Sequence, residues 1–508
     1  MTWRDYHEST KHTVQSLRRS RHVLDWKNMP DPFRHYEGAP LLDLPADPPG
    51  PTVPALELLH GAYGTTLAAD GPAFLSQLLF HSAAISASKV VPSTGDRYAL
   101  RVNPSSGNLH PTEFHFLTRG LKRWPDGLYH YRPSSHMAEQ RATGDLELKL
   151  AGGSAAPITF ILTSIAWREA WKYRDRAYRY CLHDIGHAWQ ALALAARGIR
   201  CDSFAIGGFP DDEVAQFCRV HEDEWPMLIV EIRNAEIRNA EIRNAGMRGR
   251  SIPTCDPDAR ETVWYGGRAN QLSTHQRNYP LIDAIHAATK RNSAAGPSGI
   301  FVDEGSGEVT LPAAASSRRP FGKVARTRRS ALDFRGGAES MSLAQLSAIL
   351  AAATKPLSAD FAASRFIQLY LYAHRVDEFQ AGVYRYWPQD AQLELEQIRS
   401  GDQRVMAAGL SLGQDLAGNA CVAFSMIGDL ERAAHLHGDR GYRYVHFEAG
   451  AIGHRLYLAA EALGLAATGI GAFYDDEVHR YLNLTPGPRQ VVYHFAIGYP
   501  VPDPRVGA

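Results

Sequence analysis

The spacing of apolar and polar residues divides the chain into helical and strand-like segments. Apolar residues with helical spacing occur at 73–84, 180–197, 280–290, 342–350, 409–426 and 444–463. Strands are predicted at short runs rich in β-branched and aromatic residues, at 113–118, 158–164 and 226–232. Ser342 and Gln345 have capping-box spacing, so a helix is expected to begin there. Because helices alternate with short strands, the predicted fold class is α+β.

A long stretch of this pattern occurs twice. Residues 171–214 align with residues 435–478 without a gap, and the offset is 264, as between Tyr178 and Tyr442 (442 minus 178). A match that keeps both helical and turn positions indicates a tandem duplicated domain. Two similar halves in one chain would form an intrachain pseudo-dimer with active sites between the halves.

The chain is predicted to contain four segments. Residues 1–55 are rich in proline, histidine and arginine and are expected to form an irregular arm. Residues 56–250 form the first domain, 251–320 a linker, and 321–508 the second domain. The first domain ends in three copies of Glu-Ile-Arg-Asn-Ala (231–245), whose period of five matches neither helix nor strand. We interpret this tract as a repeat expansion in a surface loop, with an interaction segment as the alternative.

Composition and charge exclude several classes of protein. The 508 residues exceed what one core accommodates, which agrees with two domains. Lys+Arg and Asp+Glu both number 54, so no net charge favours nucleic acid or a membrane surface. No apolar segment approaches the roughly 18 residues of a membrane helix, and the N-terminus lacks a signal core. Five cysteines without Cys-x-x-Cys spacing favour a cytoplasmic location over a disulfide framework or structural zinc.

The first candidate binding motif is the loop containing Pro104, Ser105, Ser106, Gly107 and Asn108. Two hydroxyls and an amide could hold the polar edge of a flat heterocycle, while the glycine permits a close approach. A turn that caps the following strand is the alternative.

The second motif is Arg328, Arg329 and Ser330, which precede a helical segment. Guanidinium groups and a hydroxyl suit a phosphate, because arginine forms bidentate charge-assisted hydrogen bonds. A solvated basic stretch is the alternative.

The third motif is the turn after the second long helix, which contains Gly469, Ile470 and Gly471. Glycines in this turn would let backbone N–H groups approach a ligand ring.

His183 and His187 have the i, i+4 spacing that can bind a metal on a helix. No third ligand is near, and the second copy has Phe447 and Ala451 at these positions. We therefore assign the two histidines to packing or hydrogen bonding and predict no metal site.

Together these motifs resemble the nitroreductase family of FMN enzymes, and specifically the SagB/ThcOx-type dehydrogenases. The segments that carry the resemblance are 6–12, 24–26, 101–111, 172–173 and 264–273. The resemblance implies two tandem nitroreductase-like folds with mixed or antiparallel sheets flanked by helices. It also implies that one half supplies the Arg-Arg-Ser phosphate grip and the glycine turn near flavin N5, while the other half supplies the Pro-Ser-Ser-x-Asn loop.

The two copies retain different parts of this expected site. The start of the first copy, 60–66, has no arginine, and the second copy runs from 355–358 almost directly into its strand and lacks the loop. One composite cleft therefore keeps both parts and the other keeps neither, which predicts one FMN per chain. Leu332 departs from the family pattern, because an arginine usually stands two positions after the serine.

The resemblance to azoline-oxidising members implies that Lys172 and Tyr173 are the catalytic pair. A lysine desolvated beside flavin would act as general base, with the tyrosine as proton relay. The second copy has Leu436 and His437 instead, so the pair survives in the half that keeps the Pro-Ser-Ser loop.

The implied function is an FMN-dependent dehydrogenase or oxidase that converts thiazoline or oxazoline rings of a peptide-derived natural-product precursor into thiazole or oxazole. Its partners would be this peptide or a small azoline-like substrate and a candidate cyclodehydratase, and further homodimerisation stays open. One alternative is an NAD(P)H-dependent nitro or quinone reductase with the same cofactor site. The other is a non-catalytic scaffold of a modification complex.

Overall fold

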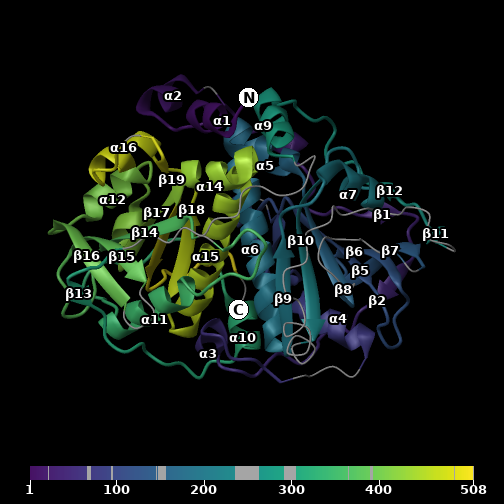
Figure 1. The fold of residues 1–508 in the computed structure, drawn as a ribbon. Helices are drawn as coiled ribbons and strands as arrows, with labels where there is room; N and C mark the ends of the chain where they lie inside the picture. Colours follow the sequence, from purple (N-terminus) through teal and green to yellow (C-terminus); the bar gives the residue numbers. More distant parts are fainter. Residues whose placement is uncertain are drawn as a thin grey trace.

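The structure is a computed structural model that describes residues 1–20, 22–65, 70–92, 95–144, 146, 156–234, 262–290, 305–363, 365–388, 393–485 and 487–506. Two large sheets stand on either side of a central helix pair (Figure 1). Neighbouring strands in both sheets are antiparallel. The α+β fold with antiparallel sheets and flanking helices is confirmed.

The first sheet has the strand order β11-β7-β6-β5-β8-β10-β9, and β2 also pairs with β7. In chain order its strands are β2 (Leu41–Asp43), β5 (Thr112–Thr118), β6 (Gly127–Arg132), β7 (Met137–Thr143), β8 (Ile158–Ser164), β9 (Cys201–Ile206), β10 (Trp225–Asn234) and β11 (Val263–Trp264). Two small ribbons accompany it: β1 (Tyr36–Glu37) with β12 (Arg268–Ala269), and β3 (Ile85–Val90) with β4 (Arg97–Arg101).

The second sheet repeats this order as β13-β16-β15-β14-β17-β19-β18. Its strands are β13 (Val309–Thr310), β14 (Ile367–Ala373), β15 (Gly382–Pro388), β16 (Leu393–Ser400), β17 (Val422–Asp429), β18 (Ala466–Ile470) and β19 (Arg489–Gly498). Each sheet thus gains a short edge strand, β11 or β13, from the segment that the sequence assigned to a linker.

The central helix pair is α6 (Ala177–Gly198) and α15 (Gly441–Ala462). The helices cross at Gly186 and Gly450, which share the offset of 264 (450 minus 186). A Cβ atom on Gly186 would lie 2.3 Å from the carbonyl oxygen of Phe447, and one on Gly450 would lie 2.2 Å from that of His183. Glycine is required at both positions because the two backbones touch, and this crossing marks the pseudo-twofold relation between the halves.

The remaining helices surround the sheets and the central pair. They are α1 (Trp3–Ser9), α2 (Val14–Arg19), α3 (Ala55–Leu59), α4 (Gly71–Phe80), α5 (Ala166–Tyr173), α7 (Asp211–Cys218), α9 (Pro280–Thr289), α10 (Phe321–Thr327), α11 (Leu343–Ala353), α12 (Arg404–Leu410), α13 (Asp415–Asn419), α14 (Leu430–His437) and α16 (Asp475–Tyr481). The predicted capping box of Ser342 and Gln345 begins α11. None of the described helices is long and apolar enough to cross a bilayer.

Helices α1 and α9 hold equivalent positions in the two halves. In each half an arginine of the central helix donates hydrogen bonds to two groups. One is an aspartate of the other half, and the second is the threonine at the C-terminal end of α1 or α9. The two sets are Arg179, Asp475 and Thr10, and Arg443, Asp211 and Thr289. The expectation of an irregular arm at 1–55 is therefore wrong for α1 and α2, and α9 shows that the presumed linker contains a matching helix.

One predicted helix is wrong and one tract is only partly described. The helix expected at 409–426 is instead the end of α12, the short helix α13 and the start of β17. Leu412 and Gly413 have positive φ angles, 57° and 72°, which interrupt a right-handed helix. The first residues of the five-residue repeat, up to Asn234, belong to β10, while 235–245 lie outside the described residues.

Candidate active site

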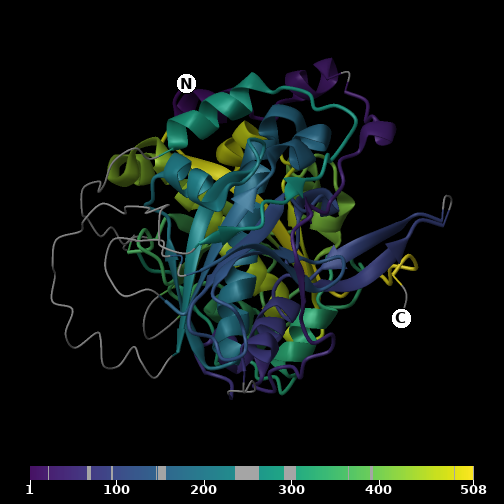
Figure 2. The same cartoon turned by 90° about the vertical axis from the view of Figure 1, so that its right-hand side faces the viewer.

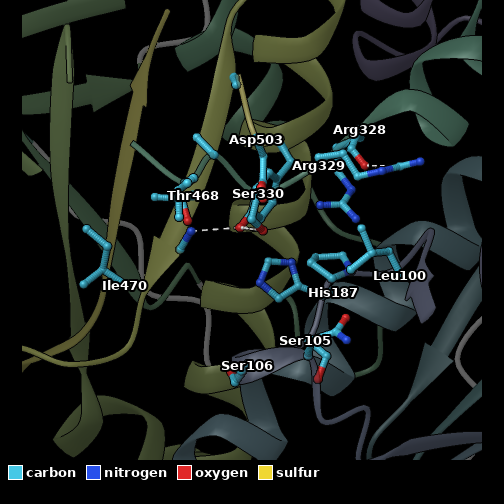
Figure 3. A pocket seen from close by; sticks show the side chains of 18 of the residues that line it. Leu100, Ser105, Ser106, His187, Arg328, Arg329, Ser330, Thr468, Ile470 and Asp503 are labelled. Atoms are coloured by element: carbon cyan, nitrogen blue, oxygen red, sulfur yellow. Dashed lines mark hydrogen bonds between the residues drawn. The ribbon is translucent and has the colours of Figure 1, made fainter. Parts of the chain in front are cut away.

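A cavity of about 620 Å³ lies between the two halves. Its walls include the loop 103–108 with His110 from the first half, and the segment 328–332, strand β18 with the turn after it, and residues 500–503 with Val506 from the second. Figure 3 shows Ser105 and Ser106 on one side of His187, and Arg328, Arg329 and Ser330 on the other. All ten residues predicted to bind a cofactor line this cavity, as does Tyr173.

Two arginines that form no ion pair among the described residues line one end of the cavity. The guanidinium hydrogen bonds of Arg328 and Arg329 go to main-chain carbonyl oxygens, including those of Arg101 at 3.1 Å and Ser86 at 2.9 Å. Arg328 is 4% exposed, and its Nε has no hydrogen-bond partner among the described residues. Burial, followed by the charges of neighbouring arginines, lowers the pKa of Arg329 to about 10. The charge of Glu461, which also lines the cavity, partly offsets this lowering, but Glu461 forms no ion pair with either arginine among the described residues. Guanidinium groups that hydrogen-bond only to main-chain carbonyls fit a phosphate.

The loop at the opposite end is held by α6. Asp184 accepts hydrogen bonds of 3.1 Å from both the backbone N–H and the hydroxyl of Ser106. The Asn108 amide donates to the carbonyl oxygen of Ala99 at 3.0 Å, and its oxygen lies 3.0 Å from Nε2 of His110. Asn108 therefore lines the cavity, but its amide nitrogen and its amide oxygen are both already engaged in hydrogen bonds that stabilise the loop.

Lys172 and Tyr173 end α5 and converge on this loop. Gly107 has a φ of 61°, and a Cβ atom there would lie 2.6 Å from Oη of Tyr173 and 3.1 Å from Nζ of Lys172. The Tyr173 ring also packs against Tyr180, with centroids 4.5 Å apart. Burial, together with the charge of Glu169, raises the pKa of Tyr173 well above its usual value. Lys172 is not among the cavity-lining residues, but its amine reaches the loop that forms the wall.

The turn expected directly after the second long helix is wrong for Gly469 and Ile470, which end strand β18, whereas Gly471 begins the turn that follows it. Two tyrosines shape this glycine segment. A Cβ atom on Gly469 would lie 2.0 Å from Oη of Tyr493, and one on Gly471 would lie 2.3 Å from Cε1 of Tyr180. Both glycines line the cavity together with Ile470. The close contacts with the two tyrosines are sufficient to require glycine at both positions, whether or not a ligand also approaches them.

The roof of the cavity was missed from the sequence. Figure 2 shows the β3–β4 hairpin projecting from the body, with the C-terminal segment beside it. The backbone N–H of Val90 donates to the carbonyl oxygen of Arg505 at 2.8 Å, and Lys89 Nζ lies 3.6 Å from Asp503. Lys89, Leu100, Asp503 and Val506 line the cavity, so each half contributes to the roof.

His187 was assigned to packing or hydrogen bonding, and it makes such a contact, but it also lines the cavity. Its Nε2 lies 3.1 Å from Oη of Tyr493, and its Nδ1 has no partner among the described residues. Burial lowers the pKa of His187 to about 3, so its ring is neutral. The sequence did contain one signal that His187 lies at the site: the second copy has Ala451 at the equivalent position, so the histidine is specific to the first copy. His183 stacks on Tyr493 in the protein interior, and the described residues contain no cluster suited to a metal ion.

The pseudo-equivalent cleft is filled by the chain itself. The backbone N–H groups of Gly207 and Gly208 donate to the Asp360 carboxylate at 2.8 and 3.0 Å. The Phe361 ring stacks on Tyr444 with centroids 4.2 Å apart and an angle of 6°. By the offset of 264, these glycines correspond to Gly471 and Ala472, and Tyr444 corresponds to Tyr180. We call the cavity beside Gly471 the open cleft and the filled site beside Gly207 the closed cleft.

Comparison with protein families matches residues 81–232 and 325–499, more than half of the chain, to the nitroreductase family. The chain belongs to the nitroreductase family. A solved structure of a candidate nitroreductase from Anabaena variabilis ATCC 29413 is 25% identical, covers 98% of this chain and 99% of its own, and has a TM-score of 0.74. This nitroreductase-family chain therefore shares the whole two-sheet architecture with a solved relative.

Two curated proteins match shorter stretches of this nitroreductase-family chain. A candidate nitroreductase from Methanocaldococcus jannaschii is 32% identical over 124 residues, which are 24% of this chain and 61% of the relative. The microcin B17-processing protein McbC from Escherichia coli is 31% identical over 143 residues, which are 26% of this chain and 53% of the relative. The chain thus spans between half and two thirds of the length of these relatives.

Proposed function

We propose that this nitroreductase-family chain is an FMN-dependent oxidoreductase of the SagB type that oxidises azoline rings in a peptide-derived precursor. The observation that carries the proposal is the open cleft, where Arg328 and Arg329 of one half face the Gly107 loop of the other, and Lys172 and Tyr173 contact that loop. Arg328, Arg329 and Ser330 would hold the FMN phosphate. Ser105, Ser106 and the turn at Gly469 would border the ring, and Pro104 would keep the loop stiff.

When bound, FMN would supply a hydride acceptor. Lys172 Nζ would take the proton from the azoline ring carbon, and the loop at Gly107 would fix the position of this amine. Because its pKa is raised, Tyr173 stays protonated at neutral pH and can donate a hydrogen bond to the substrate or to Lys172. Asp184 would keep the Ser106 backbone in place while the substrate binds.

The likeness to a microcin B17-processing protein supports a peptide substrate. A cyclodehydratase that forms the azoline ring would then be the natural partner, because it supplies the group to be oxidised. Cys181, Cys201 and Cys421 are buried and carry free thiols, which supports a reducing, cytoplasmic setting.

The test is anaerobic mixing of the purified yellow protein with a thiazoline-bearing model peptide, followed by flavin absorbance. We expect bleaching by the peptide and recovery of colour when air is admitted. Bleaching by NADPH alone, with no response to the peptide, would contradict the proposal and favour a nitro or quinone reductase. A protein that binds no flavin would instead favour the scaffold.

A further inference from the structure

The hydroxyl group of Tyr457 lies between the segment 328–330 and strand β18, although none of the sequence motifs includes this residue. Tyr457 belongs to α15, is 3% exposed and lines the open cleft. Its Oη lies 2.8 Å from Oγ of Ser330 and accepts a hydrogen bond of 2.9 Å from the backbone N–H of Gly469. The guanidinium carbon of Arg328 lies 5.0 Å from the centre of the Tyr457 ring. One buried side chain therefore contacts three groups that line the same end of the cleft.

The Tyr457 ring is held by its neighbours, so the position of its hydroxyl is fixed. The ring packs edge-on against Phe495 of β19, with centroids 4.8 Å apart, and its centroid lies 5.9 Å from that of the His187 ring on α6. The backbone of Ser330 is also fixed, because it forms a parallel β-bridge with Ala467 of β18. Rotation about the Cα–Cβ bond is then the main freedom of the Ser330 side chain, and the contact with Tyr457 restricts it.

The hydrogen bonds around Tyr457 indicate which hydroxyl donates to the other. The phenol oxygen already accepts the Gly469 N–H, so the phenol proton needs an acceptor, and Ser330 Oγ is the one that the described residues offer. If Ser330 donated instead, the phenol proton would have no acceptor in this part of the chain. Donation from Tyr457 leaves the Ser330 proton without a protein acceptor, and Ser330 is exposed to the cavity. The Ser330 hydroxyl can therefore donate to a ligand.

The duplication separates this arrangement from a demand of the fold. Tyr457 corresponds to Ala193 of α6 by the offset of 264 (457 minus 193). The central helices share other tyrosines, because Tyr180 and Tyr444 correspond to each other. At the position of Tyr457, tyrosine occurs only in the half that supplies Ser330. Its hydroxyl thus accompanies the phosphate grip and is not part of the frame that both halves retain.

We propose that Tyr457 is a positioning residue that orients the Ser330 hydroxyl toward a phosphate monoester, so that the open cleft discriminates between FMN and a flavin without phosphate. This inference rests on the proposed function. Tyr457 donates to Ser330 Oγ, and the Ser330 proton is then directed to a phosphate oxygen, which is a strong acceptor. Arg328 and Arg329 supply the positive charge. Riboflavin places no phosphate at this end of the cleft, so it gains nothing from the oriented proton.

The test compares the binding of FMN and riboflavin by fluorescence titration of the flavin-free protein. Tyr457→Phe keeps the ring with its contacts and removes only the hydroxyl group. Loss of the acceptor for the Gly469 N–H should affect both flavins alike, whereas loss of the contact with Ser330 should affect FMN alone. We therefore expect Tyr457→Phe to weaken FMN binding about tenfold more than riboflavin binding.

The matched control is Tyr372→Phe. Tyr372 is also a buried tyrosine of the second half, its hydroxyl lies 3.1 Å from Oγ of Ser425, and neither residue lines the cavity. This variant loses a tyrosine–serine hydrogen bond of the same kind, but at a distance from the proposed phosphate site. It should leave the ratio of FMN to riboflavin affinity unchanged.

A double-mutant cycle tests whether Tyr457 acts through Ser330. Ser330→Ala should lower the ratio of FMN to riboflavin affinity about tenfold, and addition of Tyr457→Phe should lower it little further, because the hydroxyl to be oriented is absent. Riboflavin binding by each variant shows that its cleft is intact. The proposal is overturned if Tyr457→Phe weakens both flavins equally, or if the effects of the two substitutions on the ratio are additive.

Failure of this inference is distinguishable from failure of the proposed function, because no azoline substrate enters the titration. A protein that shows the expected ratios but does not oxidise azolines would disprove the proposed reaction and support the role of Tyr457. A protein that binds neither flavin would contradict both.

Discussion

The open and closed clefts are built on the same frame and differ in what fills them. In both, the glycine directly after strand β18 or β9 faces a tyrosine of the other half, Gly471 with Tyr180 and Gly207 with Tyr444. In the closed cleft the backbone N–H groups of the turn bind the Asp360 carboxylate. In the open cleft the corresponding residues line the cavity. The glycine turn is thus a demand of the fold, and only the surrounding side chains decide whether a ligand can enter.

The frame has been retained in both halves while the chemistry has diverged. The arginine–carboxylate–threonine sets beside α1 and α9 match in the two halves. Asp184 and Glu448 also match, because each accepts a backbone N–H hydrogen bond from the segment that leads into a strand. The arginine cluster, the serine loop and Lys172 each occur once, and all three border the open cleft. Divergence in one copy identifies the functional groups in the other.

The largest effect is expected from Lys172→Met. Loss of a general base should lower the azoline oxidation rate about 1000-fold, while FMN binding stays unchanged. The matched control is Leu436→Met at the equivalent position beside the closed cleft, which should retain full activity. Stopped-flow measurement of flavin bleaching gives the rate. Equal losses in both variants would remove the functional distinction between the clefts.

Arg328→Ala should be next in size. Removing a buried charge-assisted contact to the phosphate should weaken FMN binding roughly 100-fold, measured by fluorescence titration of the apoprotein. Arg197→Ala is the control, because Arg197 donates to Gly61 in the segment of the first half that corresponds to the phosphate grip. If Arg197→Ala weakened FMN binding as strongly, the assignment of the phosphate to the open cleft would be wrong.

Asp360→Ala should destabilise the protein without changing its flavin content. Two backbone N–H groups would lose their acceptor, which should lower the unfolding free energy by about 3 kcal/mol. Asp360→Asn keeps one acceptor oxygen and should lose less. Urea denaturation measures the change. Uptake of additional FMN by Asp360→Ala would show that the closed cleft is a blocked cofactor site.

Acid should weaken the frame that both clefts share. Burial alone would raise the pKa of Asp475, but the charges of Arg176 and Arg179 lower it to about 2. The ionised form is therefore favoured in the folded state, and its stabilisation is complete above the unfolded pKa and lost as pH falls through about 2. The unfolding free energy should fall by about 2 kcal/mol between roughly pH 4 and pH 2.

The acid measurement belongs below pH 4, where Asp184 and Glu448 do not interfere. Both have a pKa raised to about 7, so they stabilise the folded state below their unfolded pKa and lose this contribution as pH rises toward 7. Urea denaturation at several pH values gives the slope. An unfolding free energy that is flat or rises on acidification would contradict the role of Asp475.

Much of the fold could be predicted because its signals are long. The 44-residue match (214 minus 171, plus 1) contains a helix, a strand and a turn, and each has the same place in both halves. The equivalence of α1 and α9 was missed because it is short: His7, Thr10 and Lys11 return as His286, Thr289 and Lys290. The false helix at 409–426 arose because two short helices and a buried strand together produce apolar spacing that resembles one amphipathic helix.

The candidate site was predictable where the family motifs are contiguous and was missed where distant segments meet. The loop at Ser105 and the grip at Arg328 are read directly from the chain. His187 was singled out only as a candidate metal ligand, and Glu169 lies within a helix whose composition gives no reason to single it out. Their places depend on the crossing of α6 with α15 and on the packing of α5, and the sequence specifies neither in a local pattern.

The central claim is that one cleft binds FMN and its pseudo-equivalent does not. The direct measurement is the amount of FMN released per chain when the purified, FMN-saturated protein is denatured. The account predicts a value near one, which Arg328→Ala reduces toward zero and Asp360→Ala leaves unchanged. A value near two, or a value near zero for the unaltered protein, would contradict it.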